Sequence, residues 1–378
     1  MNDELRTKML LNACRAPLAA WEKMRGRDSG FLSPDNAGAA KDALGLRQSS
    51  ALILSKLPRD WPEREMDRLA ACGARFVFID GPGYPVRMKD LPNPPIGLYV
   101  RGKADLDALP PMVAIVGTRG CSRYGFTVAE TLGRLVVRAG YGVVSGGAKG
   151  IDAAGHSGCL AEGGTTVAVF GTGIDRVYPA DHKPLFLEIA KRGALVSEYI
   201  MGSGGEAWRF PERNRLIVGL GGRVIVVESP EDGGAMITAR LALNIGREIW
   251  CVPGRITDPQ AKGTNSLIRD GANPIVDLSD GPFVLDEFIG KIAVPYESAP
   301  MPKPQPKKIP AKPETPPDPP MSGDEQRVLE ILKSKGGRTA DEIMAESGLG
   351  LQSVQAALAT LLAYGFVRES GPGRYGAV

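Results

Sequence analysis

The sequence predicts an α/β protein in which a doubly wound, mainly parallel sheet lies between an N-terminal helical domain and a C-terminal winged-helix domain. Three observations predict this class. Apolar runs of strand length alternate with helical segments in the middle of the chain, a helical region precedes them, and three short helical segments with a hairpin follow a proline-rich stretch. Because this alternation is typical of a parallel sheet covered on both faces, ligands are expected at the carboxyl ends of the strands.

The first predicted domain, residues 1–75, is helical. A cap region is expected at Ser33-Pro34-Asp35 and an amphipathic helix from Glu63 to Cys72. Nothing in this region has the pattern of a catalytic or binding motif, so the sequence predicts an accessory domain.

The second predicted domain, residues 76–295, contains the sheet. Helices are expected over Phe126–Ala139, Ile151–Glu162 and Met236–Ile245. The predicted strands are short and apolar, and they are Val113–Val116, Gly142–Ser145, Val167–Phe170, Ala194–Ser197, Val224–Glu228 and Ile249–Val252.

A linker is predicted over residues 296–320, since nine of the twenty residues 301–320 are proline and such chains are extended and semi-rigid. Residues 321–378 then form a predicted winged-helix domain, with helices over Asp324–Lys335, Ala340–Ser347 and Leu351–Leu362 and a wing near Val367–Tyr375. The third helix has no Lys or Arg, and the domain has a net charge of −1. This favours contact with a protein over reading of duplex DNA.

The composition limits the kinds of partner, metal site and location that can be expected. The net charge of +3 neither establishes nor excludes a polyanionic partner. The five cysteines are odd in number and widely spaced, so neither a disulfide framework nor a zinc site is expected, and a cytoplasmic location fits best. With two histidines, a three-histidine metal site is excluded. No apolar run is long enough to predict a membrane span.

Glycine-rich loops follow three of the predicted strands. Gly117–Gly125 contains Arg119 and Arg123, Ser145–Asp152 contains Lys149, and the third loop is Gly171–Asp175. Glycines allow tight turns that expose N–H groups at the next helix start, where an anion can bind. The spacing does not match a dinucleotide fingerprint. Asp152 is interpreted as a helix N-terminal carboxylate, and His156 as a packed, hydrogen-bonded histidine.

The segment from Phe210 to Arg215 predicts a helix start, with Pro211 near the first turn and Arg213 and Arg215 presented together beside the free N–H groups. Such a cluster requires an anion. It is a substrate phosphate, a nucleic-acid backbone or a carboxylate of the protein itself. Nearby aromatic residues, including Trp208 and Tyr178, are typical of a groove in which bases stack; the alternative is that Phe210 belongs to the core.

Several blocks together resemble the DNA-processing protein A family, also called Smf. They are Val113–Arg119, Ser145–Asp152, Phe210–Arg215, Pro253-Gly254 and Gly263-Thr264-Asn265, with Tyr84-Pro85 and Asn93-Pro94-Pro95 upstream. The resemblance covers roughly residues 60 to 285. It implies an extended Rossmann-like domain that binds single-stranded DNA, forms a homodimer and helps to load the recombinase RecA during natural transformation, as a binding protein rather than an enzyme.

The resemblance also implies a set of residues that line a single-stranded DNA groove, with no cofactor. These are Arg119, Gly146, Gly147, Lys149, Phe210, Arg213, Asn214, Arg215, Lys262 and Asn265. Two positions depart from the family pattern. Gly233-Gly234-Ala235 stands in place of a serine-glycine-serine and lacks its hydroxyl donors, and Lys149 stands where arginine is common.

Two alternative functions are considered. One is a nucleotide-processing enzyme similar to the lysine-decarboxylase-like phosphoribohydrolases, whose Pro-Gly-Gly-x-Gly-Thr-x-x-Glu signature this chain lacks. The other is a transcription regulator that reads duplex DNA with its winged helix, which the acidic balance of that domain disfavours.

Overall fold

The computed structural model describes residues 1–278, 322–335, 337–363, 366–371 and 374–377. The chain divides into two compact units, Met1–Pro295 and Tyr296–Val378, and each is described by itself. The linker predicted over 296–320 lies outside the described residues. The predicted domain boundaries at residues 75, 295 and 320 stay predictions.

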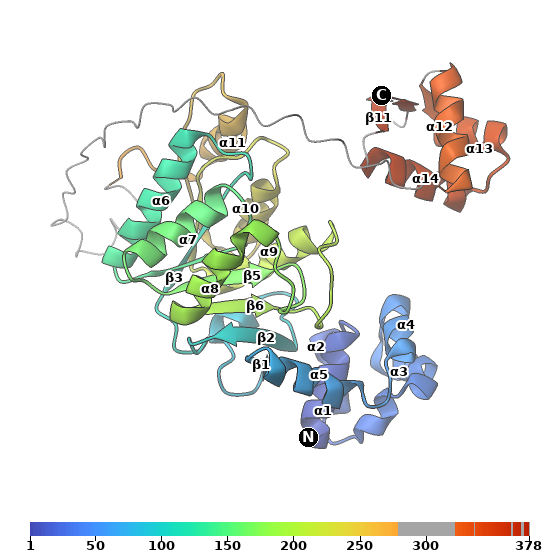
Figure 1. Ribbon diagram of the computed structural model, residues 1–378, viewed down its shortest axis with the longest axis horizontal. Coiled ribbons are helices and arrows are strands. Elements are labelled where there is room, and N and C mark those ends of the chain that lie inside the picture. The colour runs from blue at the N-terminus through green and yellow to red at the C-terminus, as the bar shows by residue number, and fades with distance from the viewer. Residues whose placement is uncertain (279–321, 336, 364–365, 372–373, 378) are drawn as a thin grey trace. The chain divides into compact units, whose positions relative to one another are not determined.

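The first part of the chain is helical, as the sequence predicts (Figure 1). Its helices have their own buried core, in which Met9, Leu11, Trp21 and Leu54 are at most 4% exposed. The elements are α1 (Asp3–Ala13), α2 (Leu18–Met24), the 3-10 turns Ser29–Leu32 and Pro34–Asn36, α3 (Ala37–Leu44), α4 (Gln48–Lys56) and α5 (Trp61–Ala71).

A nine-stranded sheet follows, in the order β1-β2-β6-β5-β4-β3-β7-β8-β9. From β6 to β9 every neighbouring pair is parallel. The strands are β1 (Ala74–Phe78), β2 (Gly97–Gly102), β3 (Met112–Val116), β4 (Gly142–Ser145), β5 (Thr166–Phe170), β6 (Ala194–Ser197), β7 (Arg223–Val226), β8 (Glu248–Cys251) and β9 (Asn273–Pro274).

Chain order reverses at β3, which pairs with β4 on one side and β7 on the other. This is the topological switch point of a doubly wound sheet, where loops diverge and leave a crevice. Beyond β6 the sheet is extended by two antiparallel strands: β2 pairs with β6, and β1 pairs with β2 at the edge. These two strands were not predicted from the sequence, because the segment between them contains prolines and glycines and shows no strand–helix alternation.

Helices cover both faces of the sheet, and alternate residues of β3 show this directly. Val113 and Ile115 pack with helices α6 and α7, whereas Ala114 and Val116 pack with α9 and α10. The helices and 3-10 turns are Val86–Asp90, α6 (Arg123–Arg138), α7 (Ile151–Ala161), Ala180–His182, α8 (Lys183–Arg192), α9 (Arg209–Leu220), α10 (Gly234–Asn244), Pro259–Ala261 and α11 (Lys262–Arg269). The extended, doubly wound α/β class is confirmed.

The second unit has the predicted winged-helix pattern. A capping box between Thr339 and Glu342 starts its middle helix, and Gly348, at φ 68°, ends it. Its elements are α12 (Gly323–Lys335), β10 (Arg338–Thr339), α13 (Ala340–Ser347), α14 (Leu351–Ala363), β11 (Val367–Gly371) and β12 (Arg374–Ala377), with the strands in the order β10-β12-β11.

Candidate nucleic-acid interface

The carboxyl ends of β3, β4, β5 and β7 lie at one edge of the sheet, and their loops surround a crevice of about 490 Å³ at the switch point. We call this pocket the crevice. Its walls come from the β3 loop, the β4 loop and the first turns of α9. The lining residues used below are Thr118, Arg119, Asp152, Tyr178, Phe210, Arg213 and Asn214.

The N-terminus of α6, directly after the β3 loop, already holds an anion. Ser122 N donates a hydrogen bond of 2.8 Å to the Glu228 carboxylate, which comes from the loop after β7 and is 5% exposed. Thr118 N donates to the Glu228 main-chain oxygen at 2.7 Å. A Cβ atom at Gly125 would lie 2.3 Å from the Glu228 carboxyl carbon, so only glycine fits. We predicted exposed N–H groups for an external anion at this turn; at Ser122 that prediction is wrong.

In the first turn of α7, the Asp152 carboxylate accepts N–H groups of the β4 loop that precedes the helix. Gly146 N and Ala148 N donate to Oδ2 of Asp152, at 3.1 and 3.3 Å. Burial raises the pKa of this carboxyl above its usual value, and the nearby Arg213 opposes that rise. Asp152 is therefore a helix N-terminal carboxylate, as the sequence indicated. Gly147, at φ 70°, accepts a hydrogen bond from Nδ1 of His182 at 3.0 Å.

Arg213 connects three elements behind the crevice. Its side chain is buried, and Nη1 donates to the main-chain oxygens of Gly146, at 2.8 Å, and Val169. Burial lowers the pKa of the guanidinium to about 10, while Asp152 acts to raise it. The side chain thus joins the ends of β4 and β5 to α9, and it shapes the crevice wall rather than protruding into solvent.

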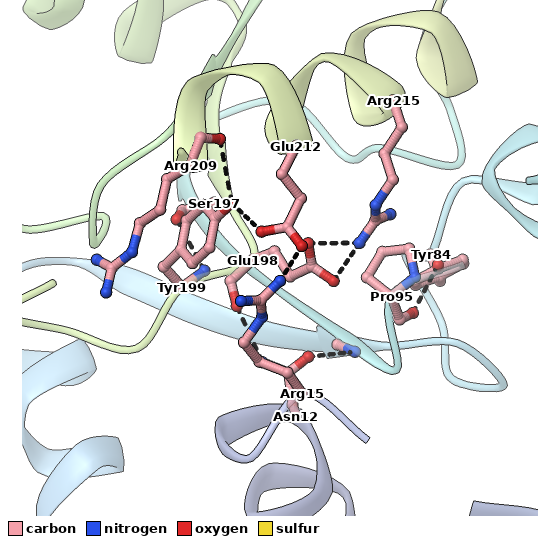
Figure 2. Close-up of polar contacts among 11 residues, drawn as sticks. Asn12, Arg15, Tyr84, Pro95, Ser197, Glu198, Tyr199, Arg209, Glu212 and Arg215 are labelled. Carbon is pink, nitrogen blue, oxygen red and sulfur yellow. Dashed lines mark hydrogen bonds and ion pairs between the residues drawn. The ribbon is translucent and has the colours of Figure 1, made fainter. Parts of the chain in front are cut away.

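Arg213 and Arg215 are not presented together, contrary to the sequence prediction. Residues two apart on a helix are rotated by about 200° around its axis, so they face opposite sides. Arg215 forms an ion pair with Glu198, on the side that faces the N-terminal helices (Figure 2). Of the three anions considered for this cluster, the structure places carboxylates of the protein itself next to both arginines.

Phe210 and Asn214 share the crevice side of α9 with Arg213. The Phe210 ring is half-buried, lies 5.2 Å from the Tyr178 ring and has the Arg119 guanidinium 5.2 Å from its centre. Asn214 Oδ1 accepts a hydrogen bond from Arg213 Nε at 3.3 Å. Tyr178 is 47% exposed, so an aromatic surface remains open at the mouth of the crevice.

The other predicted site residues lie outside the crevice lining. Lys149 is exposed and paired with Asp181 at 2.8 Å. Lys262 is exposed and lines a shallow neighbouring pocket. Asn265 exchanges two hydrogen bonds with Gly254, at 3.1 and 3.0 Å, so its amide closes a loop. Their roles in binding stay predictions.

Two features around α9 and the crevice were not predicted from the sequence. One is Glu228 as the internal anion of α6, which contacts a residue 106 positions away. The other is the cluster of Arg15, Glu198, Arg209 and Glu212 on the far side of α9 (Figure 2). The sequence contains one usable signal for the second, namely helical spacing, which places Glu212 and Arg215 on the same side.

Within the described residues, no group of three or more metal-ligating side chains converges, and no helix is long and apolar enough to cross a membrane. His156 is fully buried, with Nδ1 2.7 Å from the Thr166 hydroxyl. It is a packed, hydrogen-bonded histidine, as predicted. Burial lowers its pKa to about 3.

The fold and the crevice define a doubly wound α/β protein with a crevice at its switch point and a winged-helix unit later in the chain. The family model described as DNA recombination-mediator protein A matches residues 75–282, and the model described as DprA winged helix domain matches residues 312–371. The chain therefore belongs to the DNA recombination-mediator protein A family, which is also known as DprA or Smf.

Individual relatives agree with this assignment. The putative DNA processing protein DprA of Mycobacterium tuberculosis is 31% identical over 370 residues, which cover 96% of this chain and 88% of that protein. Protein Smf of Synechocystis is 40% identical over 205 residues, 53% of this chain, and the match spans only 52% of the relative.

Two solved structures share the fold. DNA processing protein A from Streptococcus pneumoniae superposes with a TM-score of 0.62 at 32% identity, over 75% of this chain and 96% of that one. DNA processing protein A from Helicobacter pylori gives 0.50 at 30% identity, over 55% and 93%, and that protein is described as having a unique single-stranded DNA binding mode.

Proposed function

We propose that this chain is a single-stranded DNA-binding recombination mediator and that the crevice is where the strand binds. The observation that carries the proposal is the open aromatic pair Tyr178 and Phe210 with the Arg119 guanidinium beside it. Aromatic faces for bases, together with cations for phosphates, are the two components of single-strand sites that tolerate any sequence.

The internal carboxylates support an extended ligand over a single nucleotide. Glu228 accepts an N–H group at the start of α6, and Asp152 accepts two N–H groups of the β4 loop before α7; such folds commonly bind a phosphate at N–H groups in these positions. Of the cations predicted to bind the strand, Arg119, Lys149 and Lys262 are exposed, and they are spread along the loops of the sheet edge instead of converging on one point. A row of phosphates fits such a spread better than one phosphate does.

We propose that the chain acts by binding and not by catalysis. The carboxylate that lines the crevice already has structural partners. Asp152 accepts two main-chain hydrogen bonds, and the buried His156 has a pKa of about 3, too low for a base poised near neutral pH. Loading of RecA, a homodimer, a role in natural transformation and a cytoplasmic location are parts of the same proposal, supported by membership of the family.

Affinity as a function of salt tests the proposal. Binding of a fluorescent oligothymidine to the full chain is measured by anisotropy between about 50 and 200 mM salt, and the logarithm of the affinity is expected to fall linearly with the logarithm of the salt concentration. The same titration with a duplex of equal length is the control. No binding of the single strand, or an affinity that does not change with salt, would contradict the proposal.

A further inference from the structure

A second pocket, of about 580 Å³, lies on the opposite side of α9 from the crevice. We call it the junction pocket. It is formed where the N-terminal helices meet the carboxyl end of β6. The lining residues that the argument uses are Arg15, Glu198, Tyr199, Trp208, Arg209 and Arg215.

Planar groups dominate one wall of the junction pocket. Trp208 is 49% exposed, unusually open for an indole, and the Arg15 and Arg209 guanidiniums lie 4.8 and 5.1 Å from its centre. Tyr199 lies 6.3 Å from Trp208. Unpaired bases stack on aromatic rings and on guanidinium planes, so this wall has the surfaces that a nucleobase recognises.

The charge of the pocket favours an anion. Four arginines and two glutamates line it: Arg15, Arg47, Arg209, Arg215, Glu198 and Glu212. The glutamates pair with Arg215 and Arg15 (Figure 2). Arg209 pairs with Glu206, which lies outside the lining, at 3.1 Å, so Arg47 is the lining arginine that has no ion pair among the described residues. Arg215 Nη1 is buried without a hydrogen-bond partner among the described residues, so the pocket has more donors than acceptors.

Arg15 has an unusual backbone that holds it in this position. Its φ of 57° is the only positive value among the non-glycine residues that the structure describes. This conformation is unfavourable for a residue with a Cβ atom and is found most often where the surroundings impose it. The ion pair with Glu212 and the contact with Trp208 fix the side chain over the pocket.

The two pockets are adjacent, because residues of one segment, 205–210, line both of them. Gly205, Ala207 and Phe210 line the crevice, and Trp208 and Arg209 line the junction pocket. Both open at the carboxyl edge of the sheet, the crevice around β3, β4 and β7 and the junction pocket beside β6. A strand that leaves the crevice along this edge reaches Trp208 directly.

We propose that the junction pocket is a second nucleotide subsite, in which an unpaired base stacks against Trp208 and Arg15 while the excess arginine charge binds its phosphate. The N-terminal helices then have a direct part in binding, because Arg15 completes the pocket. This inference rests on the proposed function and extends it to a longer single strand.

The experiment compares oligothymidines from about 4 to about 20 nucleotides, which spans the usual site sizes of single-strand binding folds. The full chain is tested as Trp208→Ala, Trp208→Phe and Arg15→Asn, since asparagine tolerates positive φ. Arg64→Ala, an exposed α5 arginine paired with Asp60, is the matched control. Unfolding midpoints confirm that each variant is folded.

Trp208→Ala and Arg15→Asn are expected to weaken the binding of long oligomers about tenfold and to leave the shortest unchanged, with partial recovery in Trp208→Phe. Since Trp208 is the most exposed of the four tryptophans, long oligomers should also quench the fluorescence of the unchanged chain and quench Trp208→Phe less.

Three results would overturn the inference. Equal losses at every length would show that Trp208 belongs to a single site with the crevice. Unchanged affinities in all three variants, with Arg119→Ala weakened, would leave the proposed function intact and exclude the second subsite. No binding of any oligomer by the unchanged chain would exclude both.

Discussion

The two sides of α9 use their arginines differently, although the residues are neighbours in sequence. On the crevice side, Arg213 is buried against main-chain oxygens and Asp152, and the open surface comes from aromatic rings and Arg119. On the junction side, Arg215 and Arg15 are neutralised by glutamates at the pocket margin (Figure 2). The difference shows that a run of cations in sequence is divided by helical rotation into separate environments, each with its own anion.

The largest expected effect is the loss of the buried Arg213. Arg213→Ala leaves the oxygens of Gly146 and Val169 without this donor and Asp152 without a nearby cation, so the free energy of unfolding should fall by about 4 kcal/mol. Denaturant unfolding measures it, with Arg64→Ala as the exposed control. If Arg213→Ala unfolds at the same midpoint as the unchanged chain but loses DNA, Arg213 is a direct contact and the assignment of the two sides is wrong.

Arg215 should have a smaller effect, because its ion pair with Glu198 is partly open to solvent, with side chains 16% and 12% exposed. Arg215→Ala is expected to lower the free energy of unfolding by about 3 kcal/mol, mainly because Glu198 loses its partner. The Arg215→Ala, Glu198→Gln double variant should recover part of this loss. A double variant whose loss equals the sum of the single losses would show that the pair is not coupled.

A pH dependence of stability is expected from the buried His156 in α7. Burial lowers the pKa of His156 from 6.5 to about 3, so the unfolded chain takes up the proton first as the pH falls. Stability is then fully present above pH 6.5 and decreases below it, by about 2 kcal/mol at pH 5. Burial raises the pKa of the Asp152 and Glu65 carboxyls, which favours the folded chain as the pH falls and acts against the His156 effect, so the comparison with a His156 variant isolates the imidazole.

Unfolding curves at several pH values test this dependence. His156→Gln should have a flatter profile between pH 6.5 and 5 than the unchanged chain. Equal slopes in the two proteins would show that His156 is not held neutral by burial.

Arg119 should have the smallest effect on stability and a clear effect on binding. Arg119→Ala removes an exposed cation that forms no ion pair among the described residues, so the unfolding midpoint should not change. The affinity for oligothymidine should fall by about 1 kcal/mol, and the salt slope should decrease by about one unit. Salt titrations of both proteins provide the comparison. An unchanged slope would mean that Arg119 does not contact a phosphate.

Local patterns predicted most of the fold. For two strands, Gly142–Ser145 and Ala194–Ser197, the predicted bounds are those of β4 and β6 in the structure. Buried parallel strands are short apolar runs, which makes their ends easy to recognise. The presence of a switch point could also be predicted, because strand–helix alternation is typical of doubly wound sheets. The antiparallel β1 and β2 were not predicted, because β2 joins the sheet by pairing with β6, about a hundred positions away, and, among the described residues, β1 pairs only with β2.

The site was harder to predict than the fold, because several of its contacts join residues that are far apart in the sequence. The crevice residues Arg119, Phe210 and Asn214 could be identified from their loops and helix start. The carboxylates that fill the helix N-termini could not all be recognised, since Glu228 reaches Ser122 only through the folded sheet. The opposite directions of Arg213 and Arg215 could have been predicted from helical geometry. The junction pocket could not, because residues of α1 and α4 come together with the end of β6 only in the folded chain.

Photocrosslinking of the full chain to a short oligothymidine, followed by mass spectrometry of the attached peptides, tests the central claim most directly. The account predicts that the crosslinked peptides contain Tyr178 and Phe210 at the mouth of the crevice. Crosslinks confined to the winged-helix residues 322–377 would contradict it.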